Sequence, residues 1–352
     1  MRYLPTSRLT PGMALGQDIY DGAGRLLLGR HILLTEEQIS NLEFLGFPGA
    51  YVDDEFSRGI EIQQIVSPEV RRQALKIVYD LFHMDMRKQE PSEAELKLRK
   101  TVESVVDDVI CNGDIMCNIM DIKSYDDYIY YHSIHVGILS VVVGARLGLS
   151  HDKLCQLAAA ALLHDIGKRF IDHDIVRGGK AHRSEKEQEV YRSHPKIGAE
   201  YLRETCRFPA DVYEGIMEHH ECYNGEGYPL GKKGGGIHLF ARIIRIADCY
   251  DAKVSAFPAQ KSLSPSEALE YVMALGDRWF DPDIVAVFAR KVAAYPIGCE
   301  VELSNGQHAG VARNFENFPL RPLVRVVETG EMLNMRDDEK ARAVTVGRLI
   351  VR

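Results

Sequence analysis

Histidines gather in one part of this chain, beside predicted helices that are otherwise apolar. Ten of the 13 histidines lie between residues 132 and 238. The segment EHHECYNGEGYP, residues 218–229, places two of them side by side before a turn built from Asn, Gly and Pro. One buried imidazole is satisfied by an ordinary hydrogen bond, whereas two in a row before a stiff turn favour metal binding.

Seven side chains form the candidate set. Five are imidazoles and two are carboxylates, on separate and mostly apolar segments: His132, His164, Asp165, His194, His219, His220 and Asp248. Neutral imidazole and carboxylate bind Fe, Mn, Zn, Co or Ni without any cysteine. Seven ligands exceed one tetrahedral site but match two metals that share a bridging carboxylate. Such a pair supplies hydroxide at neutral pH and stabilises the charge of a phosphoryl transition state.

Taken one at a time, these residues also have ordinary structural explanations. His164 and Asp165 at the end of one helix suit a capping pair, and His194, which precedes a proline, suits a helix cap. Asp248 and Asp251 lie one turn apart on an otherwise apolar helix, where neither acid belongs without a partner. The metal hypothesis therefore depends on the whole set and not on any single member.

Four apolar segments with helical spacing must position these side chains, at residues 130–150, 152–168, 193–202 and 237–256. In the first, His132 shares a helical face with His135. The second is rich in Leu and Ala and delivers His164 and Asp165 at its inner end. The acidic and imidazole groups are costly in such apolar surroundings unless they are paired or bound to a cation.

Patterns along the chain divide it into four parts: a small N-terminal α+β module of unknown role at 1–66, connecting helices at 67–99, the metal-binding helical domain at 100–296 and a small C-terminal β module at 297–352. In the first part, YDGAGRLLL predicts a hairpin, GAYVDD a strand, and the intervening residues a helix capped by Thr35 and ended by Gly46. The last part has strand spacing around a turn at Asn305 and Gly306. The expected fold class is mainly α, a central helical bundle with two small modules.

Composition excludes several classes of function. A hydrophobic content of 45% and a charged content of 27% describe a folded, soluble protein, and the net charge of −8 disfavours binding to a DNA or RNA polymer. The longest apolar run is far short of a membrane span, and the first residues lack a signal-peptide core. Seven cysteines without a CxxC pair fit reduced thiols. We therefore expect a cytoplasmic protein with no membrane span.

The order of the motifs resembles that of a known family. YYHSIHV, HDIGK, SHPKIG, HHECYNGEGYP and ADCYDA together resemble the HD-GYP subgroup of the HD phosphohydrolase superfamily, over roughly residues 100–295. The resemblance implies an HD-type helical bundle that hydrolyses the bacterial second messenger cyclic di-GMP to linear pGpG, in some members on to GMP. It also implies two divalent metal ions, with iron or manganese expected.

The resemblance assigns the first metal to His132, His164, Asp165 and Asp248, and the second to His194, His219 and His220, with Asp165 bridging both. Asp165 and Lys168 are expected to be catalytic, because Lys168 resembles the family lysine that contacts the scissile phosphate. The residues expected to bind substrate are Lys168, Gly227, Tyr228, Pro229, Asp251 and Arg183.

Two kinds of protein partner follow as expectations. In some relatives the Gly-Tyr-Pro loop also contacts partner domains, so a cyclase of the GGDEF type is a candidate partner. The amphipathic helix expected at 68–88 has a face that suits pairing of two copies in a homodimer, or equally the exposed face of a monomer.

Two positions depart from the family pattern. Tyr128 stands one turn before His132, where some relatives carry a glutamate that recruits a third metal, so we expect two metals. Phe257 stands where most relatives have an arginine that holds the substrate phosphate. A lost charged hydrogen bond costs about 1.5–3 kcal/mol, roughly a ten- to hundred-fold loss of substrate capture, unless Arg183 or Arg245 replaces it.

Three alternatives to an active cyclic di-GMP phosphodiesterase stay open. The first is a catalytically weak sensor of cyclic di-GMP or a docking module for a GGDEF domain, which the complete ligand set opposes and the missing arginine favours. The second is a phosphohydrolase of another nucleotide, including other cyclic dinucleotides. The third is a helical scaffold with incidental histidines.

Overall fold

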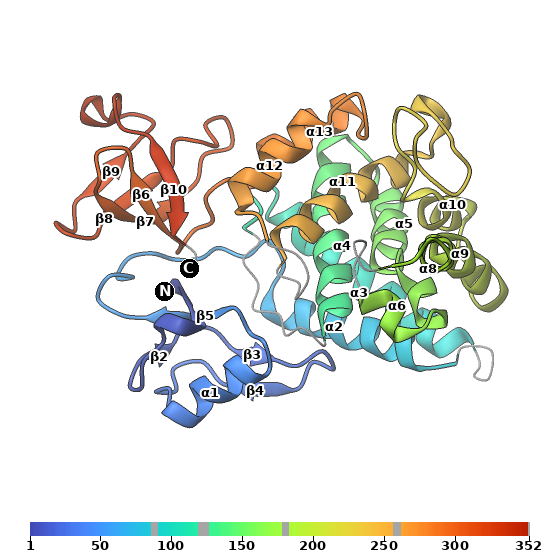
Figure 1. Cartoon of the computed structure of the whole chain (residues 1–352), viewed down its shortest axis with the longest axis horizontal. Helices are drawn as coiled ribbons and strands as arrows, with labels where there is room; N and C mark the ends of the chain where they lie inside the picture. The colour runs from blue at the N-terminus through green and yellow to red at the C-terminus, as the bar shows by residue number, and fades with distance from the viewer. Residues whose placement is uncertain (86–90, 119–126, 178–182, 256–261, 351–352) are drawn as a thin grey trace.

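A helical domain occupies one side of the molecule and two small β-containing modules occupy the other (Figure 1). The computed structural model describes residues 1–85, 91–118, 127–177, 183–255 and 262–350. The two termini lie close together between the small modules (Figure 1). There the N–H of Tyr3 donates to the carbonyl of Gly298 at 2.9 Å. The chain thus leaves the N-terminal module, forms the helices and returns to it.

The helical domain consists of α2 Pro68–His83, α3 Pro91–Cys111, α4 Tyr128–Arg146, α5 His151–Leu162, η2 Ile166–Phe170, α6 His173–Arg177, α8 Glu185–Arg192, α9 His194–Thr205, α10 Ala210–Glu218, η3 Gly234–Gly236, α11 Leu239–Val254, α12 Pro265–Ala274 and α13 Pro282–Lys291. Helix α4 is its centre and packs against α2, α3, α5, α11 and α13. A helix enclosed on all sides must be apolar all round, and residues 131–144 are all buried. Among the described helices it alone has the length and hydropathy of a membrane span, yet it lies mostly inside the protein.

The N-terminal module contains β1 Arg2–Pro5, η1 Thr6–Arg8, β2 Ala14–Leu15, β3 Ile19–Tyr20, β4 Leu26–Leu28, α1 Glu36–Phe44 and β5 Gly49–Asp53. Its sheet has the antiparallel order β1-β5-β2, and β3 and β4 form the predicted hairpin. Thr35 caps α1 in a capping box with Gln38, and Gly46 follows the helix with a positive φ of 76°. The hairpin, helix and strand predicted for this module are confirmed.

The C-terminal module is a five-stranded antiparallel sheet in the order β10-β6-β7-β8-β9. Its elements are β6 Glu300–Leu303, β7 His308–Arg313, β8 Leu323–Val326, β9 Met332–Asn334, η4 Glu339–Ala341 and β10 Val346–Ile350. The predicted turn at Asn305 and Gly306 joins β6 to β7, with a φ of 82° at the glycine. The fully buried Lys291 at the end of α13 links this module to the helices. Its ammonium donates to the carbonyl of Gly113 and to Glu316, each at 2.8 Å.

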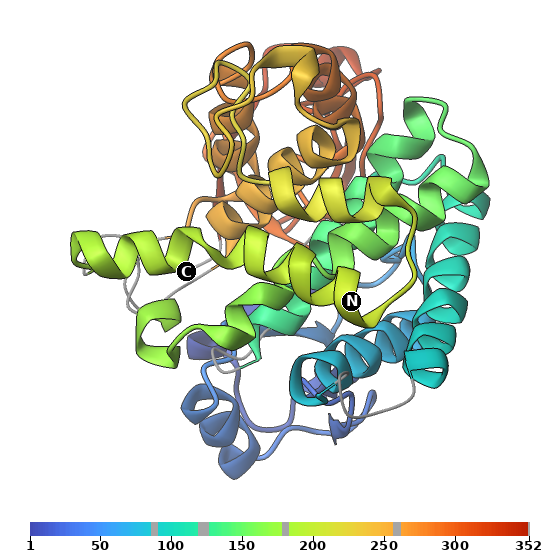
Figure 2. The ribbon, with the colours of Figure 1, turned by 90° about the vertical axis from the view of Figure 1, so that its right-hand side faces the viewer.

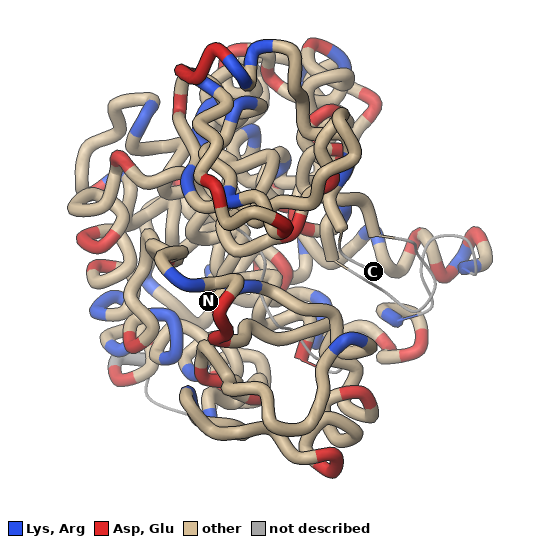
Figure 3. The backbone as a smooth tube through the Cα atoms, turned by 90° about the vertical axis from the view of Figure 1, so that its left-hand side faces the viewer, with Lys and Arg blue, Asp and Glu red and all other residues tan. Residues whose placement is uncertain are grey.

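The predicted fold class is confirmed, but one predicted boundary lies inside an element. Helix α3 runs unbroken across residue 99 and packs against α4 and α5, so it belongs to the helical domain and not to a connection. The apolar face of α2, expected either to pair two copies or to face solvent, packs within the chain against α3 and α4. On the side formed by the two small modules, basic and acidic residues are interspersed (Figure 3).

Candidate metal centre

Five helices deliver the predicted ligands to one place inside the helical domain, which Figure 2 views from the side of α8, α9 and α10. His132 lies on α4 and Asp248 on α11, His164 and Asp165 follow α5, His194 begins α9, and His219 and His220 follow α10. Six of these side chains are buried and His220 is 13% exposed. The structure therefore brings all seven together from segments far apart in the sequence.

The side chains form two groups that share Asp165. The first contains His132, His164 and Asp165, and the second contains Asp165, His194, His219 and His220, with ligand atoms within 4.8 Å of one another in each group. Oδ1 of Asp165 lies 3.2 Å from Nε2 of His194 and 3.9 Å from Nε2 of His219. Its Oδ2 lies 3.4 Å from Nε2 of His164 and 3.8 Å from Nε2 of His132. One carboxylate thus presents one oxygen to each group.

Asp248 lies at the edge of both groups. Its Oδ1 is 3.2 Å from Nε2 of His132, and its Oδ2 is 3.9 Å from Nδ1 of His220. It is not a member of either tight group, but like Asp165 it lies near a histidine of each.

Three of the histidines are held by the same local construction. Each follows the last turn of a helix, where carbonyl groups lack intrahelical partners. Nδ1 of His164 contacts the carbonyl of the residue three positions earlier at 2.7 Å, and His194 and His219 do the same at 2.7 and 2.6 Å. A carbonyl only accepts, so each Nδ1 carries the proton and each Nε2 presents its lone pair to the cluster. This is the arrangement by which outer partners fix the tautomer of a metal-binding histidine.

Several polar atoms in the cluster are buried without a hydrogen bond. They are Nε2 of His164, Oδ1 of Asp165 and Nε2 of His220. An unmade hydrogen bond of a buried polar group costs about 1–3 kcal/mol, and these orphaned atoms belong to the two groups that share Asp165. Divalent cations satisfy lone pairs of this kind, so the donor set fits metal ions.

The electrostatics at His219, His220 and Asp165 match what a divalent metal requires. Burial, together with the neighbouring imidazoles, lowers the pKa values of His219 and His220 well below 6.5 and keeps both neutral. Burial opposes ionisation of Asp165, but the ammonium of Lys168 and the ring of His164 outweigh it and hold the pKa of Asp165 well below 3.8. Metal binding needs deprotonated ligands, and these groups are already in that state.

His132 is oriented from behind by Asp251. Its Nδ1 contacts Oδ2 of Asp251 at 2.7 Å, while the other oxygen of Asp251 contacts Nδ1 of His135, also at 2.7 Å. Burial alone would lower the pKa of His132, but the carboxylates of Asp248 and Asp251 raise it to about 9. The ring of Tyr128 stacks on His132 with centroids 5.1 Å apart, at the position where a glutamate would recruit a third metal.

This geometry favours a task for Asp251 other than the predicted substrate contact, which stays a prediction. The side chain is fully buried and both of its oxygens face histidine rings, so it has no surface turned toward a substrate. The spacing of Asp248 and Asp251 on one helix was a visible signal, but nothing in the sequence told a ligand from the acid that orients it. His135, the second partner of Asp251, was noted only for sharing a face with His132.

Two glycines allow the elements of the cluster to touch. Gly167 in η2 and Gly198 in α9 meet where η2 crosses the start of α9. A Cβ on Gly167 would lie 2.0 Å from the carbonyl oxygen of His194 and 2.8 Å from the nitrogen of Gly198. No side chain can occupy that space. The glycines of HDIGK and SHPKIG therefore place Asp165 beside His194.

Two glutamates beside the paired histidines fasten the loop that follows them. Oε1 of Glu221 accepts a hydrogen bond from the N–H of Leu230 at 2.6 Å. The carboxylate of Glu218 accepts from the ammonium of Lys232 at 2.5 Å and from the N–H of His238 at 2.8 Å. The histidines and the glutamates thus have separate tasks, since the glutamates hold the loop and the imidazoles face the cluster.

The Gly-Tyr-Pro loop forms one wall beside the cluster. A Cβ on Gly227 would lie 2.2 Å from the nitrogen of Cys222, so only glycine fits there. The ring of Tyr228 stacks on the ring of His220 with centroids 4.8 Å apart. Pro229 follows through a cis peptide bond and is exposed. Tyr228 is therefore the loop residue in direct contact with the candidate ligands.

Lys168 lies against the shared carboxylate. Its ammonium donates to Oδ2 of Asp165, and it also lies 5.3 Å from the ring centroid of Tyr191. The Tyr191 ring in turn neighbours the ring of His194, with centroids 5.2 Å apart. Tyr191 was not singled out from the sequence, because a tyrosine on a polar helix carries no signal of its own.

Two arginines stack on the tyrosines that border the cluster. The guanidinium of Arg183 lies 3.6 Å from the ring centroid of Tyr191 and also donates to the carbonyl of Ile175 at 2.6 Å. The guanidinium of Arg192 lies 5.4 Å from the ring centroid of Tyr228. Each arginine is thus one aromatic ring away from a candidate metal ligand.

Arg245 approaches the cluster from α11. Its Nη1 lies 3.6 Å from Oδ2 of Asp248, and its buried Nε has no hydrogen-bond partner. Phe257, the position of the missing family arginine, lies outside the described residues. Arg245 therefore remains a candidate for the guanidinium that Phe257 does not supply.

Comparison with known proteins agrees with this geometry. Residues 118–284 match the family model described as HD domain. The chain contains an HD domain. The same stretch carries the Gly-Tyr-Pro loop beside the histidine pair, which is the feature that resembles the HD-GYP subgroup.

Two curated relatives and one solved structure are similar to this chain. The cyclic di-GMP phosphodiesterase PA4108 of Pseudomonas aeruginosa is 31% identical over 226 residues, 64% of this chain and 54% of that protein. The cyclic di-GMP phosphodiesterase response regulator RpfG of Xanthomonas campestris is 39% identical over 151 residues, 42% of this chain and 39% of that protein. Bd1817, an HDG"Y"P protein from Bdellovibrio bacteriovorus, is 18% identical with a TM-score of 0.52, covering 82% of this chain and 97% of Bd1817.

The matches cover only part of each curated relative. The chain spans about half of the first curated relative and less of the second. The likeness to Bd1817 is a likeness of fold.

Proposed function

We propose that this HD domain is a metal-dependent phosphodiesterase that hydrolyses cyclic di-GMP to pGpG. The observation that carries the proposal is the pair of His/Asp groups joined through Asp165, with its orphaned lone pairs and with Lys168 at its side. The relatives named as cyclic di-GMP phosphodiesterases support the choice of substrate.

The ligand assignment follows the two groups. His132, His164, Asp165 and Asp248 would hold one divalent ion, and His194, His219, His220 and Asp165 the other. When bound, such a pair activates water and stabilises negative charge on phosphorus. An imidazole- and carboxylate-rich set suits iron or manganese, and we propose one of these as the native metal.

The remaining side chains would bind and orient the substrate. Lys168 is placed to neutralise an oxygen of the scissile phosphate, since its ammonium already lies against the shared carboxylate. The rings of Tyr191 and Tyr228 border the cluster, and nucleobases would stack on such rings where the covering arginines move to the phosphates. Arg183 and Arg192, stacked on these rings, would hold the second phosphate and the base edges. All seven cysteines are free thiols, which supports a cytoplasmic location.

The experiment combines metal analysis with product analysis on one preparation. The protein is purified without oxygen, its iron and manganese content is measured, and cyclic di-GMP is followed by chromatography over time. We expect about two metals per chain and accumulation of pGpG, with GMP appearing later if hydrolysis continues. Negligible metal would contradict the proposal. Tight binding of cyclic di-GMP with full metal content and no product would favour the sensor function instead, and a panel of other cyclic dinucleotides would identify a different substrate.

A further inference from the structure

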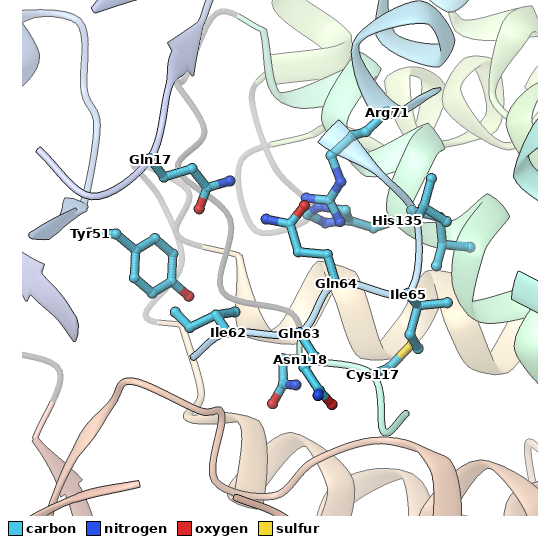
Figure 4. Close-up of a pocket in the computed structure, with 12 residues that line it drawn as sticks. Gln17, Tyr51, Ile62, Gln63, Gln64, Ile65, Arg71, Cys117, Asn118 and His135 are labelled. Atoms are coloured by element: carbon cyan, nitrogen blue, oxygen red, sulfur yellow. The ribbon is translucent and has the colours of Figure 1, made fainter. Parts of the chain in front are cut away.

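A second polar hollow lies between the N-terminal module and the helical domain (Figure 4). It encloses about 30 Å³, room for a few water-sized groups, and about 520 Å³ when the part open to solvent is counted. Its described lining comes from three places: Gln17 and Tyr51 in the N-terminal module, residues 62–66 in the segment before α2, and Arg71, Cys117, Asn118, His135 and Ile138 in the helical domain. The hollow is therefore built from both parts of the chain.

The lining of this hollow is rich in hydrogen-bonding groups. Four carboxamides line it, from Gln17, Gln63, Gln64 and Asn118, and no carboxylate is found among the described lining residues. Arg71 supplies a positive charge. The amides of Gln17 and Gln64 and the hydroxyl of Tyr51 point toward the middle of the hollow (Figure 4). Among the described lining groups an oxyanion meets several donors, whereas a cation meets no carboxylate.

Gln64 carries an unmet hydrogen-bonding group. Its Oε1 is buried and has no hydrogen-bond partner. The oxygen and nitrogen of a side-chain amide are assigned from their surroundings, and the reverse orientation would present the NH₂ group instead. Either orientation leaves a buried polar atom that a bound ligand would satisfy, with its oxygen as acceptor or with a protonated oxygen as donor.

The wall of the hollow continues into the metal centre. His135 lines the hollow, and its Nδ1 contacts Asp251 at 2.7 Å. The other oxygen of Asp251 contacts His132 at 2.7 Å, and His132 faces Asp165 and Asp248. Two hydrogen bonds thus connect His135 at the hollow to His132, a candidate metal ligand.

We propose that this hollow binds a phosphate group, either free or carried by a nucleotide, and that its occupancy is transmitted to the metal centre through His135 and Asp251. The guanidinium fork of Arg71 and the surrounding amides match the several oxygens of a phosphate. The proposal does not depend on the reaction at the metal centre, because it concerns different residues and a different ligand.

The binding test uses metal-loaded protein titrated calorimetrically, in separate experiments, with inorganic phosphate and with GMP. Gln64→Glu keeps the shape of the side chain and places a negative charge in the hollow. Gln307→Glu makes the same change on the turn between β6 and β7 and serves as the matched control. We expect the wild type and the control to bind at two classes of site. The variant at Gln64 loses one class by at least tenfold and keeps the class at the metal centre.

The outcomes of this test separate cleanly. Binding of inorganic phosphate identifies the free ion, and binding of GMP alone identifies a phosphate carried by a nucleotide. Equal affinities in the wild type and in Gln64→Glu for both probes would overturn the proposal. If Gln64→Glu does not fold, Gln17→Glu on the N-terminal wall takes its place with the same readout.

Coupling is tested by the rate at which a chelator removes the metals. We expect inorganic phosphate or GMP to change the rate of metal removal in the wild type. This change should be at least twofold larger than the change that the same probe causes in Gln64→Glu. The same change in both proteins would refute transmission through His135, because the probe would then act at the metal centre alone.

Discussion

Three carboxylates near the cluster differ in what faces them, and this difference sets their tasks. Asp165 faces the Nε2 atoms of His164 and His194. Asp248 faces Nε2 of His132. Asp251 instead faces Nδ1 atoms of two rings. We propose that a carboxylate in the first position binds metal and one in the second position orients a ligand.

Asp251→Asn tests this distinction. The amide keeps one acceptor but turns an NH₂ group toward one of the two rings, so His132 loses its anchor. We expect metal affinity to fall roughly 10–100-fold, measured by metal titration with a fluorescent chelator. The KM of protein that is reloaded with excess metal should be unchanged. Asp174→Asn, an exposed position on α6, is the control. Normal metal affinity with a raised KM would favour the prediction that Asp251 binds substrate.

Arg183→Ala and Arg192→Ala test the arginine–tyrosine pairs. Each removes a charge placed to contact a substrate phosphate, which is worth about 1.5–3 kcal/mol, so the KM for cyclic di-GMP should rise roughly ten- to hundred-fold. Metal content should stay constant. Arg203→Ala removes a guanidinium that lies 5.2 Å from the ring of Tyr213, away from the metal ligands, and controls for loss of the stacking alone. Unchanged KM values in both test variants would exclude these arginines from substrate binding.

At the scale of elements, the cluster depends on how closely helix ends approach one another. Helices α5, α8 and α10 each end beside a histidine, and η2 crosses α9 at a pair of glycines. The ends are brought together by the apolar helices α4, α5 and α11 that pack behind them. The candidate metal ligands are thus brought together by the places where these elements cross, and no single helix carries the whole set.

Gly167→Ala tests the closest crossing. The added Cβ would overlap the His194 carbonyl, so η2 and α9 must separate and Asp165 must move away from His194. We expect a loss of stability of about 1–3 kcal/mol and a metal content of one ion or fewer per chain, followed by thermal unfolding and elemental analysis. Gly235→Ala in η3, where a Cβ meets nothing within 4 Å, should behave as wild type. A fully loaded, stable Gly167→Ala protein would show that the crossing tolerates expansion.

The sequence predicted residues that are marked by their own helix, and it missed contacts that depend on the packing of two helices. His164, His194 and the paired histidines are marked by their own helix ends, and hydrophobic periodicity predicted the helices that carry them. The contact of Asp251 with His135 links α11 to α4, and the stack of Arg183 on Tyr191 depends on how α8 packs. Such pairings arise from tertiary packing, which local propensity does not encode. The predicted boundary at residue 99 falls within α3 for the same reason, since the packing of that helix is not visible in its own sequence.

At the scale of the whole molecule, few polar links tie the helical domain to the small modules, and Lys291 is the most deeply buried of those described. It is 1% exposed, and its ammonium spans Gly113 and Glu316. The carboxylate of Glu316 also forms an ion pair with Arg146, with Nη2 of Arg146 2.7 Å from Oε2 of Glu316. The C-terminal sheet is therefore held to α4 and α13 by one shared carboxylate as well as by apolar contacts.

Lys291→Met tests this link. The thioether chain fills similar space but leaves the carbonyl of Gly113 without its donor, at a cost of about 1–3 kcal/mol. For a chain of this size that corresponds to a fall of several degrees in Tm, measured by calorimetry, with metal content unchanged. Lys340→Met, at a position where the side chain is 84% exposed, is the control. Equal Tm values for the two variants would show that apolar packing alone holds the sheet.

Main-chain carbonyls of their own helix ends set the inward direction of the His164, His194 and His219 rings. The side chains around these rings are therefore not needed to orient them. Substitution of neighbouring side chains would leave the inward direction of these rings unchanged. Substrate preference can therefore diverge among such chains faster than metal retention.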